Sequence, residues 1–376
     1  MKSVGIITFH RTYNFGAVLQ AYALRRVVAK LGLQSEIIDF QPVVLRRQYQ
    51  LFILSRRIAR LKRNWKVLVR LKEHLVLRGR FRSFFREQMG LGRHPLATRF
   101  EDLSRWTAKY DVYLSGADMI WNPCFLDAGD KDCGRAYYLD FVKDGQGRRA
   151  SYASSFGVTE IPDVHRIKIA AMLNRFHSLS SREDVGCKLI QQLTGRAAEH
   201  VLDPTLLLTS SEYDEVAVPP SMSEPFILLY PMEPSDVFCR LARKVQELLR
   251  LPTVAVVPHN SQPDKFVFVD KVVYDAGPAE FLGWMKAAAF VCTNSYHGTC
   301  FSLIYGKTFL GVPDSGSNMR SLNLLQRLGL THRQMTQPEE LHSAHPLLGP
   351  TDYVSLEPRL QQAINQSRDY LKRALA

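Results

Sequence analysis

Short apolar runs alternate with amphipathic helical stretches along the chain, a pattern typical of parallel α/β sheets. The first run, "VGIITF" at 4–9, leads through the loop "HRTYNFG" into a helix that ends near Gly32, and "EIIDF" at 36–40 follows as the next strand. Further strand-like runs occupy 111–116, 149–157, 176–183 and 198–208. The pattern predicts an N-terminal α/β lobe over residues 1–210.

A stretch rich in Pro and Ser, "VPPSMSEP", marks a boundary near 210–224, and a second alternation of strands and helices follows it. Its strand-like runs lie at 226–230, 253–258, 266–269, 290–293 and 308–313. We expect a C-terminal α/β lobe over 211–350 and a final amphipathic helix within 351–376. Ligands of such sheets bind outside the carboxyl ends of the strands, so the predicted site lies in a cleft between two Rossmann-like lobes.

The positive charge of the chain is concentrated in one segment. The 376 residues carry a formal net charge of +13, and residues 46–93 hold 15 Lys or Arg against two acidic residues. An apolar residue recurs every three or four positions there, which predicts a basic helical insertion over about 44–95; the stripe is Ile58, Leu61, Trp65, Leu68, Leu71 and Leu75. The helix either lies on an anionic membrane surface or packs on its own domain with a solvated basic face. Binding of nucleic acid is not favoured, because no known binding motif accompanies the charge.

The cysteines and the hydropathy exclude several classes of protein. The six cysteines form no CxxC pair and no Cys/His grouping with zinc spacing, so we expect reduced thiols and no metal. The first residues, "MKSVGIITFH", lack the apolar region of a signal peptide, and no apolar run reaches the roughly 18 residues of a membrane span. These features predict a cytoplasmic protein that contacts at most the inner face of the plasma membrane.

One histidine stands at the start of a predicted helix. In "FVCTNSYHGTCFSLIYGKTF", residues 290–293 read as a strand, and Asn294 and Ser295 are good N-cap residues. His297 would then lie in the first helical turn, beside backbone N–H groups that have no partner inside the helix. Such a helix start favours a bound anion.

Four motifs in a fixed order carry a resemblance to a known family. They are "TYNFGAVLQAYAL" at 12–24, "SGADMIWNP" at 115–123, "SSRED" at 180–184 and "NSYHGTCFSLIYGKTF" at 294–309, with "ASYASSFG" and "VLDPTLLL" between them. In order and spacing, from about residue 3 to residue 330, the set resembles the polysaccharide pyruvyl transferase family. Each motif alone is weak evidence, but the ordered set is specific.

The resemblance implies a fold, a reaction and two site residues. It implies a GT-B-like fold and transfer of a pyruvyl group from phosphoenolpyruvate to a sugar as a ketal, without a cofactor. The implied acceptors are bacterial surface glycans or their lipid-linked precursors. The functional arginine and histidine of the family map onto Arg182 and His297, near which the phosphate and carboxylate of the donor are expected. An arginine at the end of a strand suits bidentate binding of such an anion.

Further residues fit the reaction. Lys307 and Arg320 are additional candidate cations, and Asn294 and Ser295 are further candidate substrate-binding residues. His297 is either the general acid for the methylene carbon or only a phosphate ligand, and Asp118 is the candidate base for the sugar hydroxyl. Each residue also has a structural interpretation without a role in the reaction: Arg182 could belong to a surface ion cluster, and Asp118 could cap a turn.

The acceptor side of the predicted site rests on three residues. Asn14 and Gly16 stand where the first helix begins, where Gly16 permits a close backbone approach and Asn14 caps the helix. Trp121 is either a platform for a sugar ring or a buried aromatic. The chain has Ala117 and Met119 where relatives often carry Ser and Gln, so the acceptor contacts there are expected to differ. Asn294 and Tyr296 also depart from the family, at positions where Asp is frequent and Arg occurs in some branches.

Two other functions remain open from the sequence. One is a GT-B-type glycosyltransferase that uses a nucleotide sugar, which would need a base pocket and a pyrophosphate site in the second lobe. The other is a non-catalytic glycan-binding protein that keeps the fold.

Overall fold

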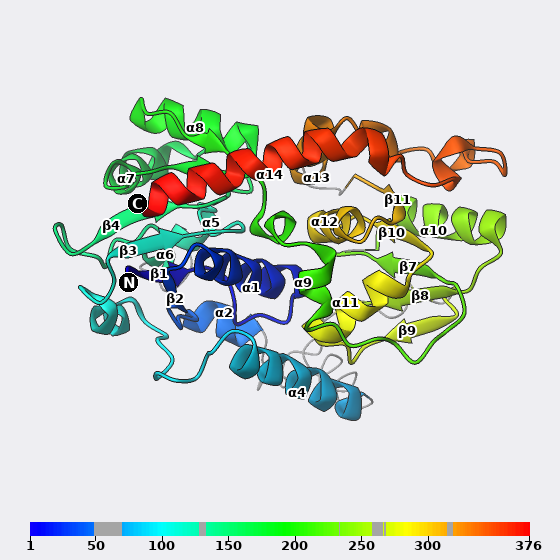
Figure 1. Cartoon of the computed structure of the whole chain (residues 1–376), viewed down its shortest axis with the longest axis horizontal. Helices are drawn as coiled ribbons and strands as arrows, with labels where there is room; N and C mark the ends of the chain where they lie inside the picture. The colour runs from blue at the N-terminus through cyan, green and yellow to red at the C-terminus, as the bar shows by residue number, and fades with distance from the viewer. Residues whose placement is uncertain (49–69, 128–132, 233, 258–265, 267, 314–318) are drawn as a thin grey trace.

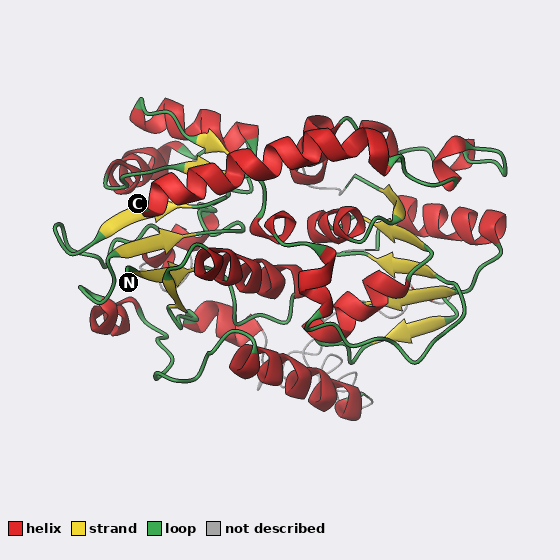
Figure 2. Cartoon of the chain, viewed as in Figure 1, coloured by secondary structure: helices red, strands yellow, loops and turns green. Residues whose placement is uncertain are grey.

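A computed structural model gives the arrangement of the chain and describes residues 1–48, 70–127, 133–232, 234–257, 266, 268–313 and 319–376. Two parallel sheets with helices around them form two lobes, which confirms the predicted two-lobed α/β class (Figures 1 and 2). Ile58, Leu61, Trp65 and Leu68 of the apolar stripe lie outside the described residues. Within the described ranges, no helix combines the length and the apolar character needed to span a membrane.

The first lobe is built on a four-stranded sheet with the order β2-β1-β3-β4. Its strands are β1 (Ser3–Ile7), β2 (Gln34–Ile37), β3 (Val112–Ser115) and β4 (Arg148–Ser151), all parallel. A short parallel pair, β5 (Ser180–Ser181) and β6 (Glu199–His200), continues beside β4. The described helices up to residue 214 are α1 (Phe15–Lys30), α2 (Val43–Gln48), α4 (Leu71–Glu87), α5 (Cys124–Asp127), α6 (Cys133–Tyr137), α7 (Asp163–Asn174), α8 (Asp184–Thr194) and α9 (Ser210–Asp214).

The second lobe contains a five-stranded parallel sheet with the order β11-β10-β7-β8-β9. Its strands are β7 (Ile227–Tyr230), β8 (Thr253–Val256), β9 (Lys271–Val273), β10 (Phe290–Thr293) and β11 (Thr308–Gly311). Its described helices are α10 (Asp236–Leu249), α11 (Pro278–Ala287), α12 (Tyr296–Ile304) and α13 (Met319–Leu328).

The strand predicted at 266–269 is wrong. The N–H of Val269 donates to the Phe266 carbonyl in a turn, and the next residue, Asp270, accepts the N–H and the hydroxyl of Thr253 at the start of β8. The chain therefore enters the sheet only after this turn, as β9.

In both sheets, the strand that comes first in the chain has a neighbouring strand on each side. β1 lies between β2 and β3, and β7 lies between β8 and β10, so in each sheet the chain adds strands first on one side of the first strand and then on the other. Ligands of open α/β sheets bind outside the carboxyl ends of the strands at such switch points. The loops that follow β1, β3, β7 and β10 are therefore the segments that can build a site.

The last helix, α14 (Tyr353–Leu375), joins the lobes. It crosses from the second lobe back to the first (Figure 1), where the Tyr370 hydroxyl donates to the Ser151 carbonyl and the Ser367 hydroxyl accepts the N–H of Leu202. One apolar cluster contains buried side chains from β1, β7, β10, α11 and α14. The two lobes thus share a continuous core.

Helix α4 is the longer described helix of the basic insertion, and its buried side chains pack on the protein. Leu77, Phe81 and Phe84 are buried, and the helix contacts α11 of the second lobe. Arg80 forms ion pairs with Asp275 and Glu280 across this contact. These three side chains of α4 are therefore covered by the protein itself, whereas Leu75 of the predicted stripe is 55% exposed.

Candidate active site

His297 lies where the two lobes meet, at the start of α12. The Thr293 hydroxyl at the end of β10 donates to the Tyr230 carbonyl of β7 and accepts the N–H of Ser295, which fixes the turn into the helix. Ser295 is the N-cap residue by position, although its side chain makes no capping bond. The His297 side chain is only 9% exposed, and a β-carbon on the following Gly298 would lie 2.9 Å from the Tyr230 ring. The start of α12 is therefore tightly held against its own sheet.

Gly16 of the first lobe packs directly on the His297 ring. A β-carbon at Gly16 would lie 2.7 Å from the His297 Cβ and would overlap the imidazole, so only glycine permits this approach. The close approach at Gly16 is made to His297 of the other lobe, and a contact with the acceptor stays a prediction. Asn14 caps α1, since its side-chain oxygen accepts the Ala17 N–H at 3.1 Å.

Asn294 lies on the second-lobe side of the same junction. Its side-chain oxygen accepts the N–H of Met232, which follows β7, at 2.8 Å. The Asn14 amide is 3.9 Å from the sulfur of Met232. Asn14 and Asn294 therefore approach the loop after β7 from opposite lobes.

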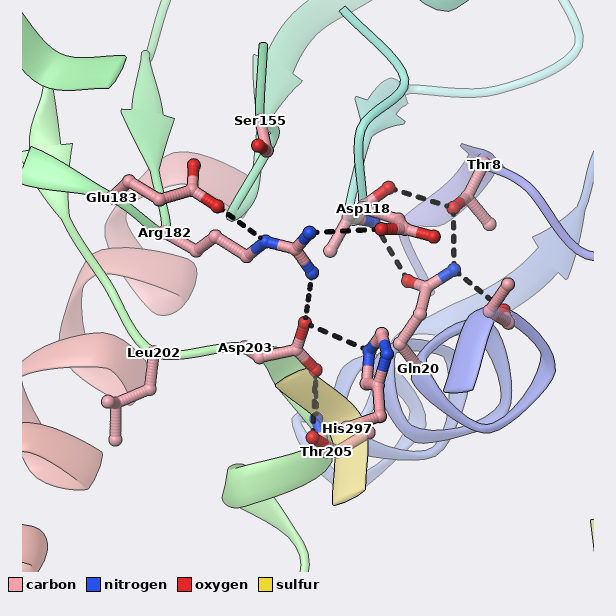
Figure 3. A network of polar contacts seen from close by, with 12 residues as sticks. Thr8, Gln20, Asp118, Ser155, Arg182, Glu183, Leu202, Asp203, Thr205 and His297 are labelled. Carbon is pink, nitrogen blue, oxygen red and sulfur yellow. Dashed lines mark hydrogen bonds and ion pairs between the residues drawn. The ribbon is translucent and has the colours of Figure 1, made fainter. Parts of the chain in front are cut away.

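Arg182, at the end of β5, is held by three carboxylates (Figure 3). Its Nε donates to Glu183 at 2.8 Å. Its two terminal nitrogens donate to Asp203 at 2.9 Å and to Asp118 at 3.0 Å. The guanidinium also lies 4.6 Å from the ring centre of Tyr296, and the side chain has no exposed surface. Arg182 is thus the centre of a buried ion cluster. Its guanidinium donates to three carboxylates and is not presented to a ligand as the sequence predicted.

Asp203 connects this cluster to the histidine. Its other carboxylate oxygen accepts the N–H and the hydroxyl of Thr205, and one oxygen lies 3.6 Å from Nε2 of His297. Burial alone would raise the pKa of Asp203, but His297 and Arg182 together hold this pKa well below its usual value. Asp203 is therefore an anion that faces the imidazole. Among the described residues, the buried Nε2 has no hydrogen-bond partner within normal distance.

Asp118 follows β3 and adopts a left-handed backbone conformation with φ of 70°. Its burial would raise the carboxyl pKa, but the charges of Arg182, His297 and Arg320 lower this pKa. Arg320, at the start of α13, is close enough for its own pKa to be lowered, first by burial and then by Arg182. His297, Asp118, Arg182 and Arg320 are thus brought together from both lobes.

Two predicted residues do not join this cluster. Trp121 is fully buried and stacks on Tyr138 with ring centres 5.5 Å apart, so the role as a platform for a sugar is wrong and the buried alternative holds. Lys307 follows the C-terminal end of α12, whose first turn holds His297, and its ammonium group donates to the Lys286 carbonyl. The Lys307 ammonium group is therefore directed to a carbonyl at the other end of α12 from His297.

Sequence reasoning missed the two acids that complete the cluster. Asp203 lies in "VLDPT", where it begins a short helical turn, and Glu183 lies in "SSRED". The available signal was an Asp-Pro pair directly after a strand-like run, which places a carboxylate at a strand's end. Gln20 was also missed. Its amide donates to the Thr8 hydroxyl and accepts the Ala117 N–H, and so ties α1 to the loop before Asp118.

The cluster combines an imidazole facing a carboxylate with cations and a helix start. Such a pair can hold and move a proton, while Arg320 and the N–H groups of α12 can bind an anion. The three carboxylates, Asp118, Glu183 and Asp203, are enough to balance Arg182, Arg320 and a protonated His297 in the described part of the site. Within the same described ranges, no group of three or more His, Cys, Asp or Glu side chains is arranged to hold a metal ion.

A sequence model described as "Polysaccharide pyruvyl transferase" matches residues 14–316 of the chain. The chain belongs to the polysaccharide pyruvyl transferase family. The match covers most of the chain and contains all four motifs except the first two residues of the earliest one. A comparison with curated proteins found no match.

The two lobes of this pyruvyl transferase family member are similar to solved structures with the GT-B-like arrangement. A putative UDP-N-acetylglucosamine 2-epimerase from Listeria monocytogenes superposes with a TM-score of 0.50 at 11% identity, covering 98% of this chain and 95% of that chain. Another UDP-N-acetylglucosamine 2-epimerase gives a TM-score of 0.51 at 13% identity, covering 99% and 95%. At this identity the likeness shows the fold alone. The GT-B-like prediction is confirmed.

Proposed function

We propose that the protein transfers a pyruvyl group from phosphoenolpyruvate to a sugar of a bacterial exopolysaccharide, capsule or cell-wall glycan precursor, forming a cyclic ketal. Membership of the polysaccharide pyruvyl transferase family supports the reaction class. The observation that carries the proposal is the His297–Asp203 pair at the start of α12, because it combines a proton donor with a helix start that suits an anion. We place the reaction in the cytoplasm.

The donor is expected at the start of α12. Phosphoenolpyruvate carries a phosphate and a carboxylate, which need cations and N–H donors. Arg320 and the first N–H groups of α12 provide such donors, whereas the N–H groups of Arg182 are directed to carboxylates. Arg182 then acts by holding Asp118 and Asp203 in place. Asn294 and Ser295 shape the turn that presents the helix start.

The transfer needs one proton donor and one base. His297 gives a proton to the methylene carbon, and the positive charge that develops at the neighbouring carbon is shared with the ester oxygen of the phosphate. A sugar hydroxyl adds to that carbon and passes its proton to Asp118. The second hydroxyl then displaces phosphate, which leaves with the electron pair of the C–O bond and takes the proton from Asp118. The proton of the second hydroxyl restores His297. The balance is phosphoenolpyruvate plus a sugar diol giving the ketal and inorganic phosphate.

Asp118 suits the role of base because of its position rather than its basicity. The lowered pKa keeps its carboxylate ionised at neutral pH, and Arg182 fixes one of its oxygens. A weak base of this kind accepts a proton only as the hydroxyl becomes acidic during attack. We assign the sugar acceptor to the start of α1, where Asn14 caps the helix and Gly16 packs on His297.

A binding experiment tests the donor. Phosphoenolpyruvate should raise the melting temperature of the protein, and His297→Ala should reduce that rise, because the mutation removes the donor at Nε2. Stabilisation by nucleotide sugars alone would overturn the proposal in favour of a glycosyltransferase. Stabilisation by glycans without release of phosphate from phosphoenolpyruvate would favour a non-catalytic glycan-binding protein.

His297→Asn separates a general acid from a phosphate ligand. The Asn amide can still donate a hydrogen bond to phosphate but cannot transfer a proton. We expect the rise in melting temperature to survive in part, and phosphate release with a panel of sugar acceptors to fall by about two orders of magnitude or more. Release at the wild-type rate would show that His297 only binds phosphate.

We also propose a peripheral contact with anionic membrane through the basic insertion. The support is the charge of residues 46–93, since Leu77, Phe81 and Phe84 of α4 are covered by the protein. The contact would therefore be electrostatic and weakened by salt. The protein should float with anionic liposomes, and a variant with the charges of this segment reversed should not. Equal flotation of the variant and the wild type would contradict the proposed contact.

A further inference from the structure

One fully buried amide, that of Gln20 in α1, has no part in the chemical steps of the transfer. Its side-chain nitrogen donates to the Thr8 hydroxyl at 2.9 Å and to the carbonyls of Phe9 and Ala17 at 3.0 and 2.9 Å. Its side-chain oxygen accepts the N–H of Ala117 at 3.1 Å. A buried amide is stable only when its polar atoms are bonded, so these four contacts fix the position of the Gln20 side chain.

Thr8, which follows β1, bonds to the same residue, Ala117. The Thr8 side chain has no exposed surface, and its hydroxyl accepts a hydrogen bond from Gln20 and donates one to the Ala117 carbonyl at 3.1 Å. The N–H and the carbonyl of Ala117 are therefore both bonded to buried side chains, one to Gln20 and the other to Thr8 (Figure 3). We call these two side chains the Thr8–Gln20 pair.

The residue after Ala117 is Asp118, the proposed base. Its φ of 70° is a left-handed conformation that side-chain-bearing residues seldom adopt. Such a backbone persists only where the surrounding structure holds it. The Thr8–Gln20 pair holds the residue before Asp118, and on the other side the Asp118 carbonyl accepts the N–H of Ser155 at 2.9 Å. Without the pair, Asp118 is free to relax toward an ordinary conformation, and its carboxylate would move.

The Asp118 carboxylate would move relative to a fixed arginine. Arg182 donates to one of its oxygens at 3.0 Å, and the Asp118 side chain is 13% exposed, which leaves it accessible to a bound hydroxyl. Arg182 also donates to Glu183 and Asp203, so it is held in place whether or not Asp118 stays. A displacement of about 1 Å in a group that accepts a proton can cost about two orders of magnitude in rate.

Helix α1 contacts the proposed acid as well as the residue that precedes the proposed base. Gly16 packs on the His297 ring, and Gln20, one helical turn later, bonds to Ala117. Residues four apart lie on the same face of a helix. The same face of α1 therefore sets where the acid lies and where the base lies.

We propose that Thr8 and Gln20 are positioning residues of the transfer, which hold Asp118 within reach of the attacking sugar hydroxyl. Both side chains are fully buried, so they act through Ala117 and touch neither substrate. The inference rests on the proposed function and deepens it, because it assigns the placement of the base to two residues that carry no charge and take no proton.

A double-mutant cycle on stability tests the pair without any substrate. Asp118→Asn should lower the equilibrium constant for folding, because Arg182 loses a buried carboxylate. In a Thr8→Val background this loss should be smaller by about threefold or more, since Asp118 is then already displaced from Arg182. Urea denaturation of the four proteins measures the difference. A loss of the same size in both backgrounds would overturn the proposal.

Thr253→Val is the matched control for this cycle. Thr253 is equally buried, and its hydroxyl donates to Asp270 and accepts the N–H of Asp270 at the start of β8 in the second lobe. The same atoms are removed and two hydrogen bonds are lost, but none of them leads to Asp118. Asp118→Asn should therefore cost the same in this background as in the wild type, within about twofold. A coupling as large as that with Thr8→Val would show general destabilisation and contradict a specific role of the pair.

Gln20→Met tests the other member of the pair. Methionine keeps the length of the side chain and removes the amide, so the effect of Asp118→Asn should again shrink by about threefold or more. If Gln20→Met folds and Asp118→Asn has its full effect there, Gln20 is not a positioning residue. If Gln20→Met does not fold, the Thr8 variants decide.

Release of phosphate from phosphoenolpyruvate with a panel of sugar acceptors gives the catalytic readout. Thr8→Val should lower kcat by about tenfold or more and leave the KM for phosphoenolpyruvate within about twofold, because the base is displaced while the start of α12 is not. Thr8→Ser, which keeps the hydroxyl, should retain most of kcat, and Thr253→Val should behave as the wild type. A raised KM with an unchanged kcat in Thr8→Val, or a Thr8→Ser variant as slow as Thr8→Val, would rule out positioning through the hydroxyl.

The two measurements separate this inference from the proposed function. If the cycle shows the coupling but the wild type releases no phosphate with any acceptor, the proposed function fails, and the pair still stands as what places Asp118. If the wild type is active and neither the cycle nor kcat responds to Thr8→Val, the pair serves the fold alone and the proposed function is unaffected.

Discussion

At the scale of single residues, the first and second lobes touch where Gly16 packs on His297, and the contact is possible because glycine has no β-carbon. The helix start of the first lobe lies directly against the ring of the proposed acid. Any larger residue must move the ring or separate α1 from α12. The position of the imidazole therefore depends on a residue of the opposite lobe.

We expect Gly16→Ala to weaken the response to phosphoenolpyruvate while the protein still folds. The added methyl displaces the His297 ring, although alanine is the better helix former by up to about 1 kcal/mol. The measurement is the rise in melting temperature that phosphoenolpyruvate causes. Gly79→Ala is the matched control, because Gly79 lies in α4 with nothing within 4 Å of its added methyl. A normal response in Gly16→Ala would show that the ring position is not critical.

Asp203 makes a contribution to stability that depends on pH. Its folded-state pKa is depressed, so the stabilisation is fully present above its unfolded value of about 3.9 and is lost as the pH falls through the lower folded value. Asp203→Asn should lower the free energy of unfolding by about 3 kcal/mol at pH 7, because Arg182 loses a buried partner. Denaturant unfolding from pH 7 downward should show the two proteins converging only below about pH 4.

Asp144→Asn is the control for this pH profile. Asp144 also has a lowered pKa, caused by hydrogen bonds from Arg149 and Arg175, but its side chain is 82% exposed. Solvent screens such a pair, so the difference from the wild type should be far smaller. An equal effect in both variants would contradict a special role for the buried cluster.

At the scale of elements, α4 of the basic insertion packs on the first lobe and also contacts α11 of the second lobe. Phe81 is fully buried, and its ring lies 5.2 Å from that of Tyr13 and 5.7 Å from that of Phe15. Arg80, on the same helix, pairs with Asp275 and Glu280 around the start of α11. Arg80 and Asp275 are each 35% exposed, so the ion pairs with the second lobe add little stability, and the aromatic contacts hold α4 on the first lobe.

Phe81→Ala should lower the free energy of unfolding by about 3–5 kcal/mol, since it leaves a cavity beneath α4. Leu75→Ala on the same helix should change it by no more than about 0.5 kcal/mol, because Leu75 is 55% exposed. Urea denaturation of both variants measures the difference. A small effect of Phe81→Ala would mean that α4 rests on the protein without supporting it.

The elements were easier to predict from the sequence than the contacts between them. The alternation of apolar runs predicted both sheets and the helix that begins just before His297, because those patterns are local. Two of the three carboxylate partners of Arg182 are distant in sequence, Asp118 at 64 residues before it and Asp203 at 21 residues after it, so its burial depends on folding. The same holds for Trp121, whose stacking on Tyr138 no local pattern reveals.

At the scale of the whole molecule, the two lobes differ from independent domains joined by a linker. Their shared core contains residues of both sheets, and α14 returns from the second lobe to bond with Ser151 of the first. Around the active site, Gly16 and Arg182 of the first lobe meet His297 and Tyr296 of the second. A site built this way is formed only when both lobes are folded.

The continuous core predicts that the lobes unfold together. Leu282→Ala, in α11 of the second lobe, should lower the free energy of unfolding by about 2–5 kcal/mol, because its side chain is fully buried in the shared cluster. Hydrogen exchange should then show that β3 of the first lobe and β10 of the second lose protection by the same amount, as elements of one cooperative unit do. Loss of protection confined to β10 would show instead that each lobe opens alone, and the active site would then be lost with the weaker lobe while the other remained folded.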